Sequence, residues 1–135
     1  MTNTQEVKEK DILIVDDDAD IREAIETALQ ELGNVRIRTV GDGNTAVDML
    51  LKQMPDLLVL DQMLPGKSGF LVLEKIAAHR KEHQGPPVIM ITANPGSRHK
   101  VYANTLGVDV YLNKPFRMDK LINAAKELLE KNNTK

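Results

Sequence analysis

The stretch that decides the fold is ILIVDDDADIRE, residues 12–23. Its first four residues are apolar and mostly β-branched, which predicts a short strand buried on both faces. Acids follow at once, and Asp18 is the candidate N-cap of the next helix. Three later apolar runs also end in polar groups, at Asp61, Thr92 and the pair Lys114-Pro115.

The rest of the chain repeats this alternation of strand and helix. Further strands are predicted at 35–40, 56–61, 87–92 and 108–112. Helices are predicted at 18–32, 44–54, 69–85, 97–106 and 117–131, with Ser68 as the N-cap of the third. Such alternation predicts a doubly wound α/β fold, with a parallel sheet and helices on both faces.

The second predicted strand, residues 35–40, reads as an edge strand. Arg36 and Arg38 stand between apolar residues, so one face of this strand is expected to be solvated. Exposed charges on an edge strand also discourage pairing with other chains.

The length of 135 residues predicts one domain with a full core. We expect a flexible N-terminal segment at 1–10, the domain at 11–131 and a polar tail at 132–135. No output domain is expected after the tail.

Composition excludes several classes of function. The net charge of −2 and the four aromatic residues argue against direct nucleic-acid binding. Cysteine is absent, so disulfides and thiolate metal sites are excluded. The N-terminus lacks an apolar signal segment, and no apolar run approaches the ~18 residues of a membrane span. A cytoplasmic protein without membrane attachment is expected.

The polar groups at the strand ends predict one shared site. In an open α/β sheet the carboxyl ends of the strands line the ligand crevice, so Asp16, Asp17, Asp61, Thr92 and Lys114 should meet there. Clustered carboxylates repel each other, and Mg²⁺, with Mn²⁺ as a substitute, relieves the repulsion. A carboxylate beside the metal can attack a phosphoryl group, whose charge an ammonium and a hydroxyl then stabilise.

The stretches ILIVDDDADIRE, DLLVLDQMLPGKSG, PPVIMITAN and VYLNKPF together resemble a response-regulator receiver domain. The resemblance covers roughly residues 11–131 and is closest to single-domain, chemotaxis-type receivers. It implies a flavodoxin-like fold with five helices and five parallel strands in the order 2-1-3-4-5.

The resemblance also implies roles for individual residues. Asp61 is the implied phospho-acceptor. Asp16 and Asp17 are the implied acid pair for Mg²⁺, with the backbone carbonyl of Met63 as a further ligand.

Three more implied roles concern the response to phosphorylation. Lys114 contacts the phosphate, Thr92 is the switch hydroxyl and Tyr111 the switch aromatic, with a cis Lys114-Pro115 bond. Gln62 departs from the family pattern, since an apolar residue often follows the acceptor.

The implied function is a phosphorylation-controlled binding module of a two-component system or phosphorelay. A histidine kinase or histidine phosphotransfer protein donates the phosphoryl group. A downstream protein binds the face made by the fourth helix, fifth strand and fifth helix. The domain supplies its own transfer chemistry and slow self-dephosphorylation, but it is not a turnover enzyme. A phosphorelay carrier, or a receiver excised from a larger protein, remain alternatives.

Other motifs compete with this interpretation. Residues 79–83 match the inverted zinc-protease pattern H-x-x-E-H, but the match lies at a polar helix end without an obvious third ligand, so a solvated helix end is the preferred interpretation. The acids at 16–20 resemble a calcium loop, but Ile21 and Thr27 occupy its glycine and glutamate positions. The same acids resemble haloacid-dehalogenase-type phosphatases, in which Asp16 would be the nucleophile.

Overall fold

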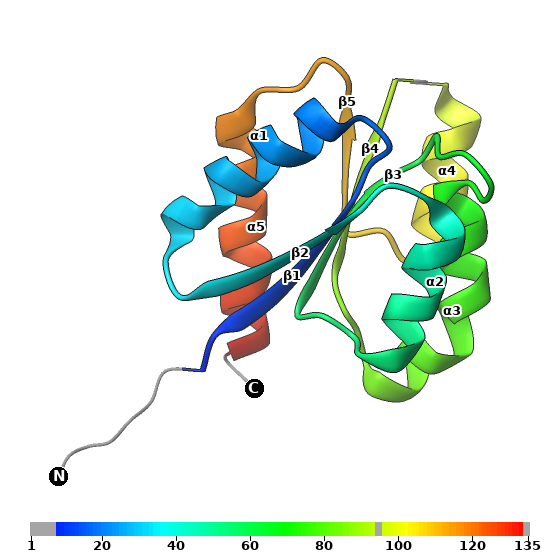
Figure 1. The fold of residues 1–135 in the computed structure, drawn as a ribbon. Helices are drawn as coiled ribbons and strands as arrows, with labels where there is room; N and C mark the ends of the chain where they lie inside the picture. The colour runs from blue at the N-terminus through cyan, green and yellow to red at the C-terminus, as the bar shows by residue number, and fades with distance from the viewer. Residues whose placement is uncertain (1–7, 94–95, 134–135) are drawn as a thin grey trace, which may run out of the picture.

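The computed structural model describes residues 8–93 and 96–133. Over these residues the elements run β1 (Lys10–Val15), α1 (Ala19–Leu29), the short 3₁₀ helix η1 (Gln30–Leu32), β2 (Val35–Val40), α2 (Gly43–Lys52), β3 (Leu57–Asp61), α3 (Gly69–His83), β4 (Val88–Thr92), α4 (Ser97–Thr105), β5 (Val110–Asn113) and α5 (Met118–Asn133) (Figure 1). The strand β1 thus includes Lys10, and α5 continues two residues past Lys131. Of the expected flexible start and polar tail, residues 1–7 and 134–135 lie outside the described residues.

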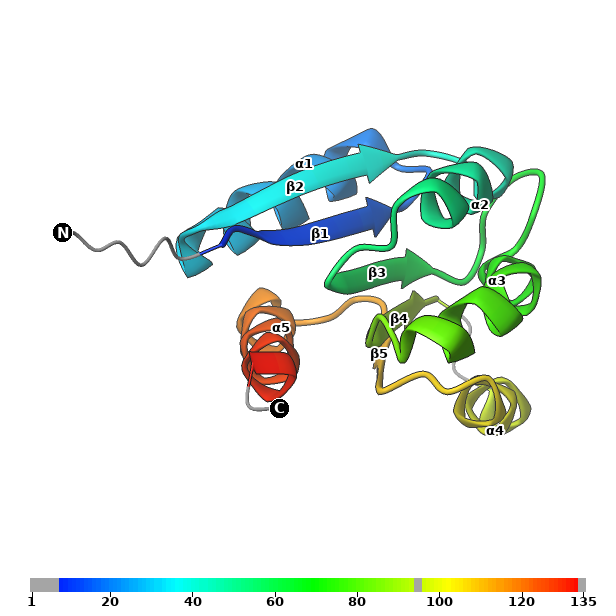
Figure 2. The ribbon, with the colours of Figure 1, turned by 90° about the horizontal axis from the view of Figure 1, so that it is seen from below.

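The five described strands form one parallel sheet in the order β2-β1-β3-β4-β5. Helices α1 and α5 cover one face, and α2, α3 and α4 cover the other (Figures 1 and 2). This arrangement confirms the predicted doubly wound, flavodoxin-like fold. Each connection between neighbouring parallel strands needs a crossover, which the helices supply.

The core consists of two apolar clusters separated by the sheet. Alternate residues of β1 enter opposite clusters, Leu13 and Val15 on the α2–α4 side and Ile12 and Ile14 on the α1/α5 side. All four are essentially inaccessible to solvent. Burying each such side chain contributes about 1.5–3 kcal/mol, which holds the central strands and their ends in place.

Side-chain caps fix where the helices near the strand ends begin. Asp18 accepts hydrogen bonds from the backbone N–H groups of Asp20 and Ile21 at the start of α1. Ser68 accepts one from Leu71 at the start of α3. Both caps were predicted from sequence, and each satisfies backbone donors that the helix leaves unpaired.

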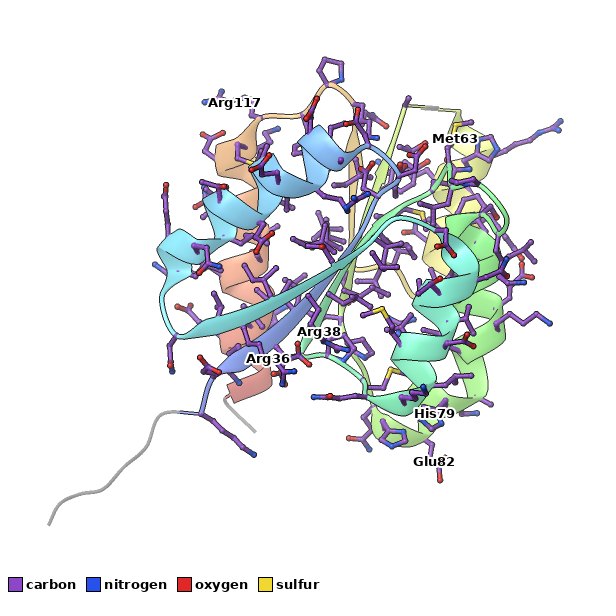
Figure 3. All side chains as sticks on the ribbon, in the orientation of Figure 1. Arg36, Arg38, Met63, His79, Glu82 and Arg117 are labelled. Atoms are coloured by element: carbon purple, nitrogen blue, oxygen red, sulfur yellow. The ribbon has the colours of Figure 1, made fainter. Side chains whose placement is uncertain are left out.

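The prediction that both arginines of β2 are solvated is wrong for Arg38. Its guanidinium donates from Nε and Nη2 to the two carboxylate oxygens of Asp11, at 3.0 and 2.9 Å. Nη2 also donates to the backbone carbonyl of Gln53 at 3.2 Å. Arg36, two residues earlier on β2, is exposed as predicted (Figure 3). Arg38 thus pairs with the buried acid at position 11, although the register places Asp11 opposite Arg36.

Replacing Arg38 with Ala should therefore lower the free energy of unfolding by about 2 kcal/mol, because a nearly buried Asp11 carboxylate loses its charged partner. The matched change of the exposed Arg36 to Ala should alter it by less than about 0.5 kcal/mol. Urea denaturation of both variants measures the difference, and equal effects would contradict the importance of the Arg38–Asp11 pair.

Candidate functional site

The carboxyl ends of β1 and β3 bring three acids together. The register pairs Val15 with Leu60, so Asp16 and Asp61 follow as neighbours at the edge of the sheet. Asp16, Asp17 and Asp61 each offer a carboxylate oxygen, and these oxygens lie within 4.8 Å of one another. Asp16 and Asp61 are buried, whereas Asp17 is exposed. The structure thus gathers the predicted acids into one cluster.

Lys114 supplies the positive charge of this cluster. Its Nζ lies 3.3 Å from Asp61 Oδ2 and 3.4 Å from Asp16 Oδ2. Its backbone N–H donates to the carbonyl of Thr92 at 2.7 Å, which fixes the end of β5 against β4. The bond between Lys114 and Pro115 is cis, as predicted.

The two buried acids are held by different partners. Asp61 Oδ1 accepts a hydrogen bond from the backbone N–H of Met63 at 3.1 Å. Asp16 Oδ1 accepts one from the N–H of Asp18 at 2.9 Å. Asp16 Oδ2, by contrast, is buried and accepts no hydrogen bond from the described residues. One lysine therefore serves two carboxylates, and the cluster retains excess negative charge.

This charge balance moves the pKa values of the acceptor and the lysine. Burial, and then repulsion by Asp16, raise the pKa of Asp61 to about 6, although the Met63 amide and Lys114 oppose the rise. Burial alone would lower the pKa of Lys114, but the attraction of Asp61 and Asp16 outweighs it and raises that pKa.

The donor set suits a hard divalent cation. Mg²⁺ prefers oxygen ligands, keeps several waters and bridges to phosphate oxygens. The oxygens within 4.8 Å of one another, together with the unsatisfied Asp16 Oδ2, fit that chemistry. Met63 lies in the loop after β3, with its side chain 56% exposed (Figure 3). The role of its backbone carbonyl as a ligand stays a prediction.

Thr92 and Tyr111, the predicted switch pair, are in contact. Their side chains share a hydrogen bond, and burial raises the pKa of Tyr111 more than this bond lowers it. Thr92 Oγ1 also donates to the side-chain oxygen of Gln62 at 2.5 Å, and both residues are buried. The sequence marked Gln62 as unusual for the family but assigned it no role.

The start of α3 lies directly against the acceptor. The N–H of Gly69 donates to the carbonyl of Gln62 at 2.8 Å. A Cβ at position 69 would lie 2.6 Å from the Asp61 carbonyl oxygen and 2.9 Å from Gln62 Cα, so the close approach requires glycine. This contact holds the backbone of residues 61–62 in place.

The second group of possible metal ligands is the H-x-x-E-H motif near the C-terminal end of α3 (Figure 3). His79, Glu82 and His83 offer ligand atoms within 4.8 Å of one another, and His83 Nδ1 lies 2.8 Å from the carbonyl oxygen of His79. A nearby pocket of about 460 Å³ is lined by other residues of α3, including Arg80 and Lys81. The histidines thus lie on a solvated helix end outside that pocket, which offers no support for zinc proteolysis.

Comparison with known proteins identifies the family. Residues 12–126 match the sequence profile described as "Response regulator receiver domain". The chain belongs to the response regulator receiver domain family. It is also 37% identical over 120 residues to the "Probable transcriptional regulatory protein TcrX" of Mycobacterium tuberculosis, covering 89% of this chain and 50% of that protein. The chain therefore spans about half the length of this curated relative.

Solved receiver domains share the fold. The receiver domain of Francisella response regulator 1452 superposes with a TM-score of 0.81 at 29% identity, covering 91% of this chain and 98% of that one. A CheY-like receiver from Methanospirillum hungatei superposes with a TM-score of 0.82 at 27% identity, covering 92% of this chain and 96% of that chain. The NtrX receiver domain of Brucella abortus superposes with a TM-score of 0.76 at 34% identity, covering 88% of this chain and 98% of that chain.

Membership establishes the class of function. This chain is a receiver domain of two-component signalling, a class that accepts phosphoryl groups on aspartate and is not a turnover enzyme. Receiver domains generally bind Mg²⁺ at an acidic pocket and interact with histidine kinases and downstream effectors. The family match excludes the phosphatase alternative. Across the described residues, no helix is long and apolar enough to cross a membrane.

The raised pKa of Asp61 predicts that the metal-free receiver loses stability as the pH rises from about 4 to about 6. The ordinary pKa of an aspartate is 3.8, so in this range the folded state holds the Asp61 proton better than the unfolded chain does. The charged carboxylate then destabilises the fold. Denaturation in EDTA at several pH values measures this loss.

Asp61→Asn should flatten the profile and be more stable than the wild type at pH 7 by roughly 1–2 kcal/mol. Asp48→Asn, at an exposed position on α2, is the control and should keep the wild-type slope. An unchanged slope in Asp61→Asn would show that Asp61 is not the titrating group.

Proposed function

We propose that Asp61 accepts a phosphoryl group from the phosphohistidine of a histidine kinase or phosphotransfer protein, with Mg²⁺ bound by Asp16, Asp17 and Asp61. The observation that carries this proposal is the setting of the Asp61 carboxylate. It is buried at the end of a central strand, within 4.8 Å of two further acids and 3.3 Å from an ammonium. We assign the exchange to the cytoplasm.

In the proposed step an Asp61 oxygen attacks phosphorus. The new oxygen–phosphorus bond forms as the phosphorus–nitrogen bond of the donor breaks, and the electron pair leaves on the imidazole. Catalysis consists mainly of positioning and charge stabilisation, because the transferring group carries its charge on three equatorial oxygens. The hydrogen bond from Met63 N–H orients the carboxylate before attack.

The remaining residues of the site stabilise the negative charge on the phosphoryl group. Asp16, Asp17, Asp61 and the Met63 carbonyl would hold Mg²⁺, which would neutralise the acids and stabilise the phosphoryl oxygens. Lys114 binds an oxygen of the product through the ammonium that already contacts Asp61. Thr92 binds another through its hydroxyl after it leaves its present partners.

We propose the surface of α4, β5 and α5 as the output face. Lys100, Asn104 and Asn113 are exposed there, and Tyr111 is half-buried. Val101, 65% exposed on α4, and Tyr102, 39% exposed beside it, add apolar area that a protein partner would cover. Movement of Thr92 toward the phosphate would change the position of Tyr111 and so alter this face.

Phosphorylation with a small acyl-phosphate donor such as acetyl phosphate tests the assignment. In the presence of Mg²⁺, intact mass spectrometry should detect a single added phosphate on the wild type. Asp61→Asn should remain unmodified because the amide is not a competent nucleophile. A phosphate retained at the wild-type level on Asp61→Asn would refute the assignment and favour Asp16 as the nucleophile.

Mg²⁺ binding should depend on Asp17 more strongly than on Asp16. The exposed Asp17 can reach a partly hydrated ion directly, whereas we expect Asp16 to act mostly through water. Asp17→Asn should weaken Mg²⁺ affinity by on the order of tenfold or more, because a hard cation loses a charged ligand. NMR-detected titration measures the affinity. Asp20→Asn, an exposed acid in the first turn of α1, is the control and should bind nearly as the wild type. Asp16→Asn should weaken the affinity less, and wild-type affinity in both Asp16→Asn and Asp17→Asn would refute the metal site.

A further inference from the structure

The side chains at the strand ends divide between the two faces of the sheet. Side chains alternate along a strand. Leu60 of β3, Met90 of β4 and Tyr111 of β5 belong to the cluster beneath α2, α3 and α4. Gln62 and Thr92, two residues further along their strands, continue on that side. Asp61 follows the opposite alternation, with Val59 on the α1/α5 side.

The switch hydroxyl is therefore held away from the acceptor carboxylate. Thr92 Oγ1 donates to Gln62 Oε1 at 2.5 Å, and Tyr111 hydrogen-bonds to the same threonine side chain. A threonine hydroxyl carries one proton, so a proton donated to Gln62 is unavailable to a phosphoryl oxygen. Thr92 must break this bond before it can donate to a phosphate on Asp61.

Gln62 is placed to hold Thr92 firmly. Its residue exposure is 8%, so its amide has little access to competing water. Its backbone is fixed on both sides, since its N–H donates to the Ile91 carbonyl and its own carbonyl accepts from Gly69, each at 2.8 Å. An apolar side chain at position 62 could fill the space but could not accept the proton.

We propose that Gln62 is a positioning residue that latches Thr92 in the unphosphorylated conformation and so opposes activation. The latch rests on the proposed function, because it assumes that Thr92 contacts the phosphoryl group on Asp61. Phosphorylation must replace the Gln62–Thr92 bond by a bond from Thr92 to the phosphate. The Gln62 amide then needs another partner, which adds to the preference for the resting state.

Gln62→Met tests the latch, because methionine has nearly the same length but is only a weak acceptor for a hydrogen bond from the Thr92 hydroxyl. The probe is beryllofluoride, a phosphoryl analogue, added with Mg²⁺. The variant should bind it about 2- to 12-fold more tightly, the range expected from the net contribution of one hydrogen bond. NMR shifts of Lys100 and Tyr111 should also move toward the activated positions before any analogue is added. Gln30→Met, at an exposed helix end, should leave both readouts unchanged.

A double-mutant cycle separates latching from general packing. In a Thr92→Val background there is no hydroxyl to hold, so Gln62→Met should no longer change the affinity for the analogue. An unchanged affinity in the single variant, or an equal gain in the Thr92→Val background, would overturn the latch. Labelling by acetyl phosphate is followed in parallel. If the wild type shows no labelling of Asp61, the proposed function is refuted. If the wild type is labelled normally but Gln62→Met does not change the affinity for beryllofluoride, only the latch is refuted.

Discussion

The repulsion between Asp16 and Asp61 is the constraint on which the rest of the site depends. At about 4 Å, two like charges near a protein surface cost roughly 4 kcal/mol. Two fully buried central strands hold these acids together, because their register leaves Asp16 and Asp61 side by side. Lys114 relieves part of the repulsion from the neighbouring end of β5. The stability of the core thus maintains an excess of negative charge that a divalent cation can relieve.

The alternation of side chains divides the remaining tasks between the faces of the sheet. Asp61 ends β3, and Asp16 and Lys114 directly follow β1 and β5. The alternation places these charged groups on the α1/α5 side. Thr92 and Tyr111 belong to the α2–α4 side, next to the half-exposed β5 and the exposed residues of α4. Thr92 ends β4 and donates to Gln62 on this second side. In the proposed switch, a phosphoryl group on Asp61 would move Thr92 and, through it, Tyr111.

Local patterns in the sequence predicted most of the fold and the charged site. Strand ends, helix starts and the caps Asp18 and Ser68 depend on neighbours within a few residues. The caps appear as expected, and the strand ends and helix starts lie within one residue of their expected positions. The bonds Arg38–Asp11 and Thr92–Gln62 were missed, since they join residues 27 and 30 positions apart. Hydrophobic periodicity does not reveal such side-chain pairings. Arg38 and Arg36 look alike in sequence, and the register even places Asp11 opposite Arg36, yet the Asp11 carboxylate binds the guanidinium of Arg38, two residues further along β2.

A buried amide beside the acceptor has a consequence that an apolar residue would not have. Gln62 is buried, and an unsatisfied buried polar group costs about 1–3 kcal/mol. Thr92 satisfies its oxygen in the resting state. If Thr92 moves toward a phosphate, the Gln62 oxygen loses its hydrogen-bond donor, and this free-energy cost must be met unless the amide finds water or another donor. The free energy gained from the bond between Thr92 and the phosphate must therefore exceed the sum of two costs, that of breaking the Thr92–Gln62 hydrogen bond and that of leaving the buried amide unsatisfied. Two discrete arrangements of Thr92 follow, because an intermediate position would satisfy neither the amide nor the phosphate.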